Sequence, residues 1–233
     1  AGFQVDTASD FADALDGLKA EAGAGGLRGL LIDLRSNPGG LLTSAVQIAD
    51  DLLERGGIVS TRGRIQAGDT SFSATPGDRM QGRPVVVLVD AGSASASEVL
   101  AGALRDNDRA CIVGSRTFGK GSVQTVMPLD NGDAVKLTTA RYYTPDGTSI
   151  QARGIEPDLV LDSEDGKPRG FVEAALPGHL AADGEEGSRP GQVLDGEEPV
   201  RQAMAALRRL AAGEPCVPAP VDTPPAPAAG DDA

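Results

Sequence analysis

The sequence predicts an α/β fold, a β-α-β spiral of parallel strands that continues into a hairpin-rich extension. From residue 10 to residue 114, helix-spaced apolar patterns alternate with short, almost wholly apolar runs. Such alternation is typical of parallel strands that are buried on both faces. From residue 121 the pattern changes to strands separated by tight turns, and Asn131-Gly132 marks a hairpin. We therefore interpret residues 1–162 as one folded core.

The elements of this core follow from periodicity and turn residues. Residues 84–89 form the most apolar run, and residues 67–83 form a polar loop with one short strand. We expect helices over 10–21, 41–53 and 95–105, and strands over 29–34, 56–65, 84–90, 109–114, 122–129 and 134–144, with 150–161 closing the core.

The C-terminal third has a different composition. Residues 163–197 are acidic, rich in Gly and Pro and without periodicity, so we expect an exposed insertion or linker. Residues 198–212 predict a helix, and residues 213–233 a disordered Pro/Ala-rich tail. Cys111 lies in an apolar run and Cys216 in this tail, so we expect a buried free thiol at Cys111 and no disulfide between them.

Charge and hydropathy narrow the class of partners. The 233-residue chain has a formal charge of −13, which argues against nucleic acid as a partner. Aromatic residues make up only 3% of the chain, so the core must be aliphatic. No apolar run reaches membrane-spanning length, so we expect no transmembrane segment in this chain, and no signal peptide is recognisable.

The predicted strand–turn–helix at residues 84–105 presents three serines, Ser93, Ser95 and Ser97. Amides at a helix start, together with the helix dipole, favour negative charge, so a serine there could attack a carbonyl while an amide holds the oxyanion. Ser95 and Glu98 also match a capping box, in which they simply satisfy helix-start amides. The spacing does not choose among the three serines.

A serine nucleophile needs a base, and the candidates are few. The one histidine, His179, lies in the acidic segment, where a surface loop residue is the simpler interpretation. With one histidine and two distant cysteines, the usual zinc ligand sets are also missing. Lys120 remains, and as a base its pKa must fall from about 10.4 to about 7 through burial. In an extended strand Lys120, Ser122 and Gln124 share one face, so Gln124 could orient the amine. The alternative is an exposed lysine in a glycine turn.

A competing interpretation concerns residues 114–120, which match the first seven positions of the phosphate-binding loop Gly-x4-Gly-Lys-[Ser/Thr]. The eighth position is Gly121, so the magnesium-binding hydroxyl is missing. That loop should also begin a helix, whereas the β-branched residues from Val123 onwards favour a strand. The pattern therefore argues against nucleotide binding.

Four motifs in order closely resemble the carboxyl-terminal processing peptidases, also called tail-specific proteases. The similarity extends from about Phe11 to Leu161. The motifs are Asp33-Leu-Arg-Ser-Asn-Pro-Gly-Gly40, the run from Gly92 to Leu104 that contains Ser-Ala-Ser-Ala-Ser-Glu, Thr117-Phe-Gly-Lys-Gly-Ser-Val-Gln124, and Ala140-Arg-Tyr-Tyr-Thr-Pro145.

The resemblance implies a crotonase/Clp-protease-like ββα spiral core and a Ser/Lys serine peptidase that requires no cofactor and no metal. Carried onto this chain, the nucleophile is Ser95, the base is Lys120 and the orienting residue is Gln124. The oxyanion hole would be formed by the amides of Ala96 and of either Gly39 or Gly40.

The resemblance also implies partners and a location. Substrates would be proteins or peptides with accessible C-terminal tails, and an adaptor protein and a homo-oligomer are further expected partners. Bacterial members generally work outside the cytoplasm, in the periplasm or cell envelope.

The chain departs from the family pattern in three places. No PDZ domain is recognisable, the strand that usually leads into Phe3 is missing, and Asp90 stands where many relatives have asparagine. The alternative function is therefore a non-catalytic, protein-binding or adaptor-dependent fragment of such a peptidase.

Overall fold

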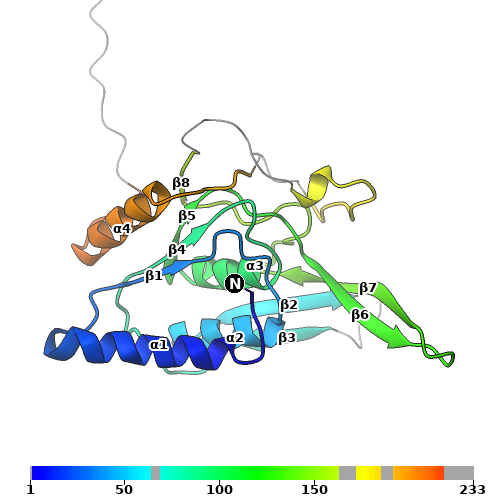
Figure 1. Cartoon of the computed structure of the whole chain (residues 1–233), viewed down its shortest axis with the longest axis horizontal. Coiled ribbons are helices and arrows are strands. Elements are labelled where there is room, and N and C mark those ends of the chain that lie inside the picture. Colours follow the sequence, from blue (N-terminus) through cyan, green and yellow to red (C-terminus); the bar gives the residue numbers. More distant parts are fainter. Residues whose placement is uncertain (1, 64–68, 163–171, 185–190, 218–233) are drawn as a thin grey trace, which may run out of the picture.

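The computed structural model describes residues 2–63, 69–162, 172–184 and 191–217, and it contains two four-stranded sheets (Figure 1). The first sheet is parallel, in the order β1 (Leu30–Asp33), β4 (Val85–Val89), β5 (Ala110–Gly114), β8 (Leu159–Val160). The second is antiparallel, in the order β3 (Thr70–Ser73), β2 (Gly57–Gly63), β7 (Ala134–Tyr143), β6 (Ser122–Pro128). The predicted α/β class is confirmed. The chain does not complete the parallel strands before the antiparallel ones, because β2 and β3 pair in the antiparallel sheet and β8, after the hairpin, returns to the parallel sheet.

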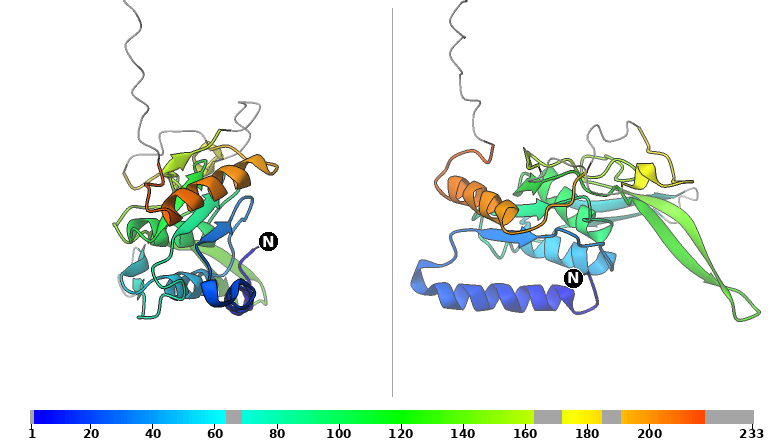
Figure 2. Two further views of the ribbon diagram at one scale, coloured as in Figure 1. Left: turned by 90° about the vertical axis from the view of Figure 1, so that its left-hand side faces the viewer. Right: turned by 45° about the horizontal axis from the view of Figure 1, so that its top comes forward.

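The described residues form four α-helices: α1 (Thr7–Ala22), α2 (Leu42–Leu52), α3 (Ala96–Asp106) and α4 (Glu198–Ala211). Helix α3 lies between the sheets and contacts both β5 and β2. Helices α2 and α1 pack beside it in turn, and α4 covers the opposite face of the parallel sheet (Figure 2). No helix in the described ranges is long and apolar enough to cross a membrane.

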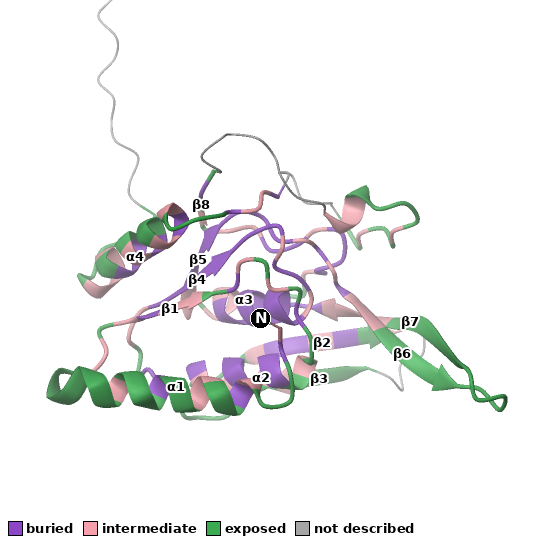
Figure 3. Cartoon of the chain, viewed as in Figure 1, coloured by how far each residue is buried: buried purple, intermediate pink, exposed green. Residues whose placement is uncertain are grey.

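Strand β4 lies between two hydrophobic cores, and this position explains why its residues are so apolar. All five of its residues are buried: Val85, Val87 and Val89 belong to the core shared with α3, whereas Val86 and Leu88 belong to the core under α4 (Figure 3). Two-sided burial is thus correct for this strand. Strand β1 is less deeply buried than expected, because it lies at the sheet edge.

The β6–β7 hairpin forms an arm that leaves the body of the molecule (Figure 1). Its turn contains Asn131-Gly132, with Gly132 at φ 88°, a conformation that glycine adopts without strain. The arm exposes apolar side chains, Val126 (60% exposed), Met127, Leu129 and Leu137. The predicted hairpin is therefore present, although most of it packs against nothing in the described chain.

The expectation of a free thiol at Cys111 is wrong, because Cys111 and Cys216 form a disulfide. Helix α4 runs across β4 and β5 and ends at Ala211, and Gly213 lets the chain turn back towards the sheet. Arg209 Nη2 donates a hydrogen bond to the Cys216 carbonyl (2.8 Å). Residues 213–217 are thus held against the core, and the rest of the predicted tail, 218–233, lies outside the described residues.

Part of the expected insertion or linker, residues 163–197, is also packed rather than exposed. Leu194 is buried in the core under α4, and its N–H donates to Asp90 Oδ2 (3.2 Å). The Gln192 carbonyl accepts the Ala91 N–H (2.9 Å). Local composition does not reveal such contacts, because they join residues about a hundred positions apart. Residues 163–171 and 185–190 lie outside the described residues.

Candidate active site

The turn between β4 and α3 is fixed by Asp90, which is fully buried. Its Oδ1 accepts N–H groups from Ser36 (2.8 Å) and Gly92 (2.9 Å), and its Oδ2 accepts that of Leu194. Three segments distant in sequence therefore meet at this turn. Its shape is set by the tertiary structure, since buried carboxylates are stable only with such partners.

The three serines of the turn have different environments. Ser93 and Ser97 are fully buried, and their hydroxyls donate to the carbonyls of Leu34 (2.7 Å) and Asn37 (3.0 Å). Ser95 is half-buried and has φ 57° and ψ −115°. Positive φ is unfavourable for a residue with a Cβ, and such strain gathers at functional turns. Tertiary contacts thus separate Ser95 from its neighbours, which the spacing could not do.

Ser95 and Glu98 form the capping box at the start of α3, and Glu98 Oε2 accepts the Ser95 N–H at 2.8 Å. The next amide, that of Ala96, has no acceptor in the part of the chain that the structure describes. It is one of the unpaired donors of a helix start. Capping and an available amide therefore coexist at the same turn.

The Asn37-Pro-Gly-Gly40 loop lies directly against Ser95. Gly39 has φ 89°, and a Cβ built there would lie 2.7 Å from the Ala96 nitrogen and 2.8 Å from the Ser95 Cβ. Only glycine allows this approach, so the loop and the helix start form one surface. The Ala96 amide and the loop glycines are therefore neighbours, and their role as an oxyanion hole stays a prediction.

The two loop glycines differ in their hydrogen bonds. The Gly39 N–H donates to Asn37 Oδ1 (3.0 Å). Gly40 pairs with Phe3 as an isolated parallel bridge, and its N–H has no acceptor within the described residues. The choice between Gly39 and Gly40 as second oxyanion donor stays a prediction.

The loop that contains Lys120 is tied to the helix start by Glu98. The N–H of Lys120 donates to Glu98 Oε2 (2.9 Å), the same oxygen that accepts the Ser95 N–H. Glu98 Oε1 accepts the Gly119 N–H (2.7 Å) and the Thr117 hydroxyl (2.5 Å). The main chains of the candidate nucleophile and base therefore meet at one carboxylate. Between their side chains, Ser95 Oγ and Lys120 Nζ, the described residues show no hydrogen bond.

Glu98 is fully buried, and this burial raises the pKa of its carboxyl from 4.5 to about 7. The four hydrogen bonds that it accepts act in the opposite direction, towards a lower pKa. The sequence pattern marks Glu98 only as half of a capping box. That pattern accounts for one of the four contacts, and the other three join it to residues about twenty positions away.

Gln124 lies on β6, close to where the arm leaves the body. Lys120 precedes the strand, so strand alternation alone does not orient its side chain towards Gln124. The pairing with β7 is also irregular between Val123 and Gln124. Gln124 is exposed, and its amide has no partner in the described ranges, so its orienting role stays a prediction. The strand that follows Gly121 contradicts a phosphate-binding loop, which needs a helix there.

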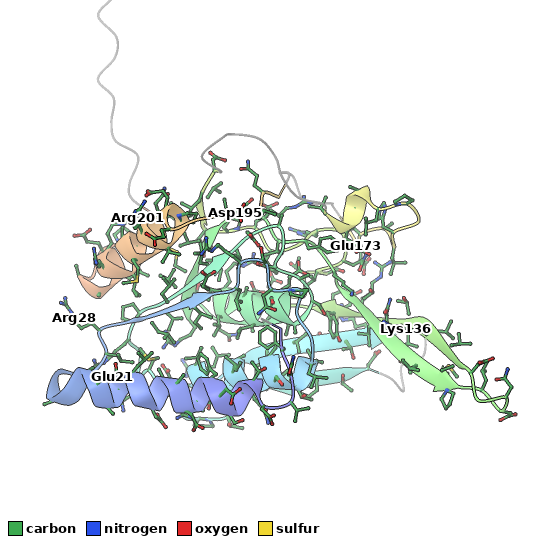
Figure 4. The ribbon with its side chains drawn as sticks, in the orientation of Figure 1. Glu21, Arg28, Lys136, Glu173, Asp195 and Arg201 are labelled. Atoms are coloured by element: carbon green, nitrogen blue, oxygen red, sulfur yellow. A yellow bond between two sulfur atoms is a disulfide. The ribbon has the colours of Figure 1, made fainter. Side chains whose placement is uncertain are left out.

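His179 belongs to the segment 172–184, which lies next to the Lys120 loop, and its Nδ1 is 3.0 Å from the Leu176 carbonyl. Within this segment the Glu173 N–H donates to the Phe118 carbonyl (2.8 Å); Figure 4 labels Glu173. Among the described residues, no group of three or more His, Cys, Asp or Glu is arranged to hold a metal ion.

Known proteins resemble this chain in sequence and in fold. Residues 1–161 match the model of peptidase family S41. The chain is 47% identical over 183 residues to a carboxy-terminal-processing protease of Bartonella bacilliformis, covering 76% of this chain and 42% of that protein. It is 44% identical over 160 residues to a carboxyl-terminal-processing protease of Synechocystis sp., covering 69% and 36%.

The solved structure of the photosystem II D1 C-terminal processing protease superimposes with a TM-score of 0.59 at 42% identity, covering 70% of this chain and 41% of that one. The chain thus spans less than half the length of these relatives. Mature CPAF, at 18% identity and a TM-score of 0.55 over 68% of this chain and 43% of its own, shares the fold. With the family model matching more than half of its residues, the chain belongs to peptidase family S41.

Proposed function

We propose that this chain is the catalytic part of a serine endopeptidase that cleaves proteins near their carboxyl terminus, with Ser95 as nucleophile, Lys120 as base and Gln124 as the orienting residue. The main support is the position of Ser95 on a strained helix start, beside the unpaired Ala96 amide and tied through Glu98 to the backbone of Lys120. The names of the relatives supply the reaction and the substrate class.

In the proposed reaction, Ser95 Oγ attacks the scissile carbonyl while the neutral amine of Lys120 takes its proton. The negative oxygen of the tetrahedral intermediate accepts hydrogen bonds from the amides of Ala96 and of Gly39 or Gly40. Lys120 then protonates the leaving amine as the peptide bond breaks. A water molecule, deprotonated by Lys120, attacks the acyl-enzyme, and Lys120 returns this proton to Ser95 Oγ as the ester bond breaks. Acid–base transfer contributes about 10²–10⁴-fold and one oxyanion donor about 10²–10³-fold, so both are needed.

We also propose that the protein works outside the cytoplasm. The Cys111–Cys216 disulfide supports this location, because disulfides persist in oxidising compartments and are rare in the cytosol. Substrates with accessible C-terminal tails, an adaptor protein and a homo-oligomer belong to the same proposal and rest on the family resemblance.

The test is to incubate wild-type protein and Ser95→Ala with an unfolded protein and to map the cleavage sites by mass spectrometry. Ser95→Ala should abolish cleavage while the protein stays folded, with a loss of about 1 kcal/mol in stability because the variant lacks the N-cap hydroxyl of α3. Ser97→Ala is the matched control, since it removes one buried hydrogen bond, to the Asn37 carbonyl, worth about 1 kcal/mol and should leave much of the activity. Ser93→Ala should also leave much of the activity but cost more stability, because the Ser93 hydroxyl donates to the Leu34 carbonyl and accepts the Asp90 N–H (3.0 Å). Cleavage by Ser95→Ala at the wild-type rate would refute the assignment.

The second candidate is a non-catalytic, protein-binding fragment of such a peptidase. It is favoured by one observation, that no hydrogen bond joins Ser95 Oγ to Lys120 Nζ in the described residues. In that case wild type and Ser95→Ala would bind an unfolded protein equally and neither would cut it. The same incubation therefore distinguishes the two candidates.

A further inference from the structure

We propose that Glu98 is a positioning residue that fixes the nucleophile and the base relative to each other by binding the main chains of both. This inference rests on the proposed function, since it concerns the same Ser95–Lys120 site. Glu98 needs no contact with substrate for this role. It acts through the two segments that it joins.

The carboxylate is fully used by its partners. Oε2 accepts the N–H groups of Ser95 (2.8 Å) and Lys120 (2.9 Å), and Oε1 accepts the Gly119 N–H (2.7 Å) and the Thr117 hydroxyl (2.5 Å). An ionised carboxylate has about four acceptor positions, so this geometry fills them. The Glu98 side chain thus positions the start of α3 and the Lys120 loop relative to each other.

The Thr117 hydroxyl donates to Glu98 Oε1 and accepts the Ile155 N–H (2.7 Å), and the other three partners of Glu98 are backbone N–H groups. All four groups that surround Glu98 are therefore donors. In a glutamine at this position, an NH₂ group would replace one of the two carboxylate oxygens. Because an NH₂ group cannot accept from the two donors at that oxygen, about half of the four hydrogen bonds would be lost. An aspartate is one methylene shorter and would not span the two segments.

Both segments are glycine-containing or strained turns that would relax without this anchor. Ser95 has φ 57°, and Gly119, beside Lys120, has φ 94°. Strained conformations persist only where surrounding contacts hold them. A displacement of about 1 Å between reacting groups can lower a rate by about 10²-fold. Glu98 therefore affects turnover through geometry rather than through substrate binding.

The kinetic test is Glu98→Gln in the full chain, assayed with a peptide substrate that the wild-type protein cleaves. We expect kcat to fall by about 10²-fold and KM to stay within about three-fold. Asp78→Asn is the matched control. The Asp78 side chain is 8% exposed and accepts the N–H groups of Met80 (2.8 Å) and Gly82 (2.8 Å) and a hydrogen bond from Arg109 Nη2 (3.2 Å). Among the described residues, none of its hydrogen bonds goes to Ser95, Glu98 or the Lys120 loop. The variant should lose stability and keep its kcat.

Amide hydrogen exchange measured by NMR gives a readout that does not depend on activity. In folded Glu98→Gln the amides of Ser95, Gly119 and Lys120 should exchange faster together, whereas Asp78→Asn should leave them unchanged. Unchanged exchange, or a kcat within about three-fold of wild type, would overturn the proposal. If wild type shows no Ser95-dependent cleavage but exchange responds as expected, the proposed function fails and the link between the two segments stands.

Discussion

The candidate site has a serine half, around Ser95, and a lysine half, around Lys120 and Gln124, and the two differ in burial and in hydrogen bonding. The serine half lies at the start of α3, where Ser93, Ser97 and Glu98 are fully buried and bonded to other segments. The lysine half lies where the chain leaves the body to form the β6–β7 arm, and Gln124 is exposed there without a partner among the described residues. Figure 4 shows Lys136 further out on the same arm.

This difference shows which groups of the site have their positions fixed by the folded core. Folding of the α3 core fixes the backbone of Ser95, the Ala96 amide and, through Glu98, the backbone of Lys120. The core does not fix the Lys120 amine or the Gln124 amide. Among the described residues, neither the Lys120 amine nor the Gln124 amide has a hydrogen-bond partner, so the Ser/Lys arrangement stays a proposal. The predictions below probe each half.

The largest effect is expected at the lysine half. Lys120→Arg should lower kcat by about 10³-fold or more, because a guanidinium cannot deprotonate at usable pH. Lys136→Arg is the matched control on the exposed arm and should leave kcat unchanged. Rates are measured with the same peptide substrate. A normal rate for Lys120→Arg would make Lys120 a structural residue.

The disulfide stabilises the face of the parallel sheet opposite the serine half. Cys216→Ser should lower the free energy of unfolding by about 2–4 kcal/mol, since the bond closes a sequence separation of 105 residues. The kcat of the folded protein should not change. Urea unfolding with and without reductant measures the effect, and the Cys111→Ser, Cys216→Ser double variant should be insensitive to reductant.

The buried carboxyl of the serine half predicts a pH effect on stability. Folding raises the Glu98 pKa from 4.5 to about 7, so between these values the folded protein retains a proton that the unfolded chain has lost. Raising the pH through this window therefore costs stability, about 3 kcal/mol once the pH exceeds 7.

Glu98→Gln does not titrate, so it isolates this contribution. The free energy of unfolding of wild type relative to Glu98→Gln should fall by about 3 kcal/mol between about pH 4.5 and pH 8. Urea denaturation at a series of pH values measures it. A difference that does not vary with pH would show that the folded-state pKa of Glu98 is not raised.

The smallest effect is expected at Gln124. Gln124→Ala should lower kcat by about ten-fold, the value of one hydrogen bond that orients the amine. Thr125→Ala is the control, because it removes a contact between hydroxyls across the arm (2.9 Å to Thr139) without altering the candidate site. Equal rates for Gln124→Ala and wild type would remove Gln124 from the mechanism.

Much of the fold could be predicted because its signals are local. The β4 run, the stripe of α3 and the Asn131-Gly132 turn each lie within a dozen residues, and the structure has the corresponding elements in those places. The motif order also identified the family. These features depend on backbone preference and on the periodicity of burial, which the sequence contains directly.

The sequence by itself therefore determined the elements, the family and a short set of candidate residues. Only the tertiary structure decided how those residues are bonded. In the folded protein the Ser93 and Ser97 hydroxyls donate hydrogen bonds to carbonyls distant in sequence. Glu98 accepts hydrogen bonds from three further partners, and Cys111 forms a disulfide with Cys216. These contacts connect residues about 20 to 105 positions apart. No local pattern encodes them, because they exist only once the sheets and helices have packed together.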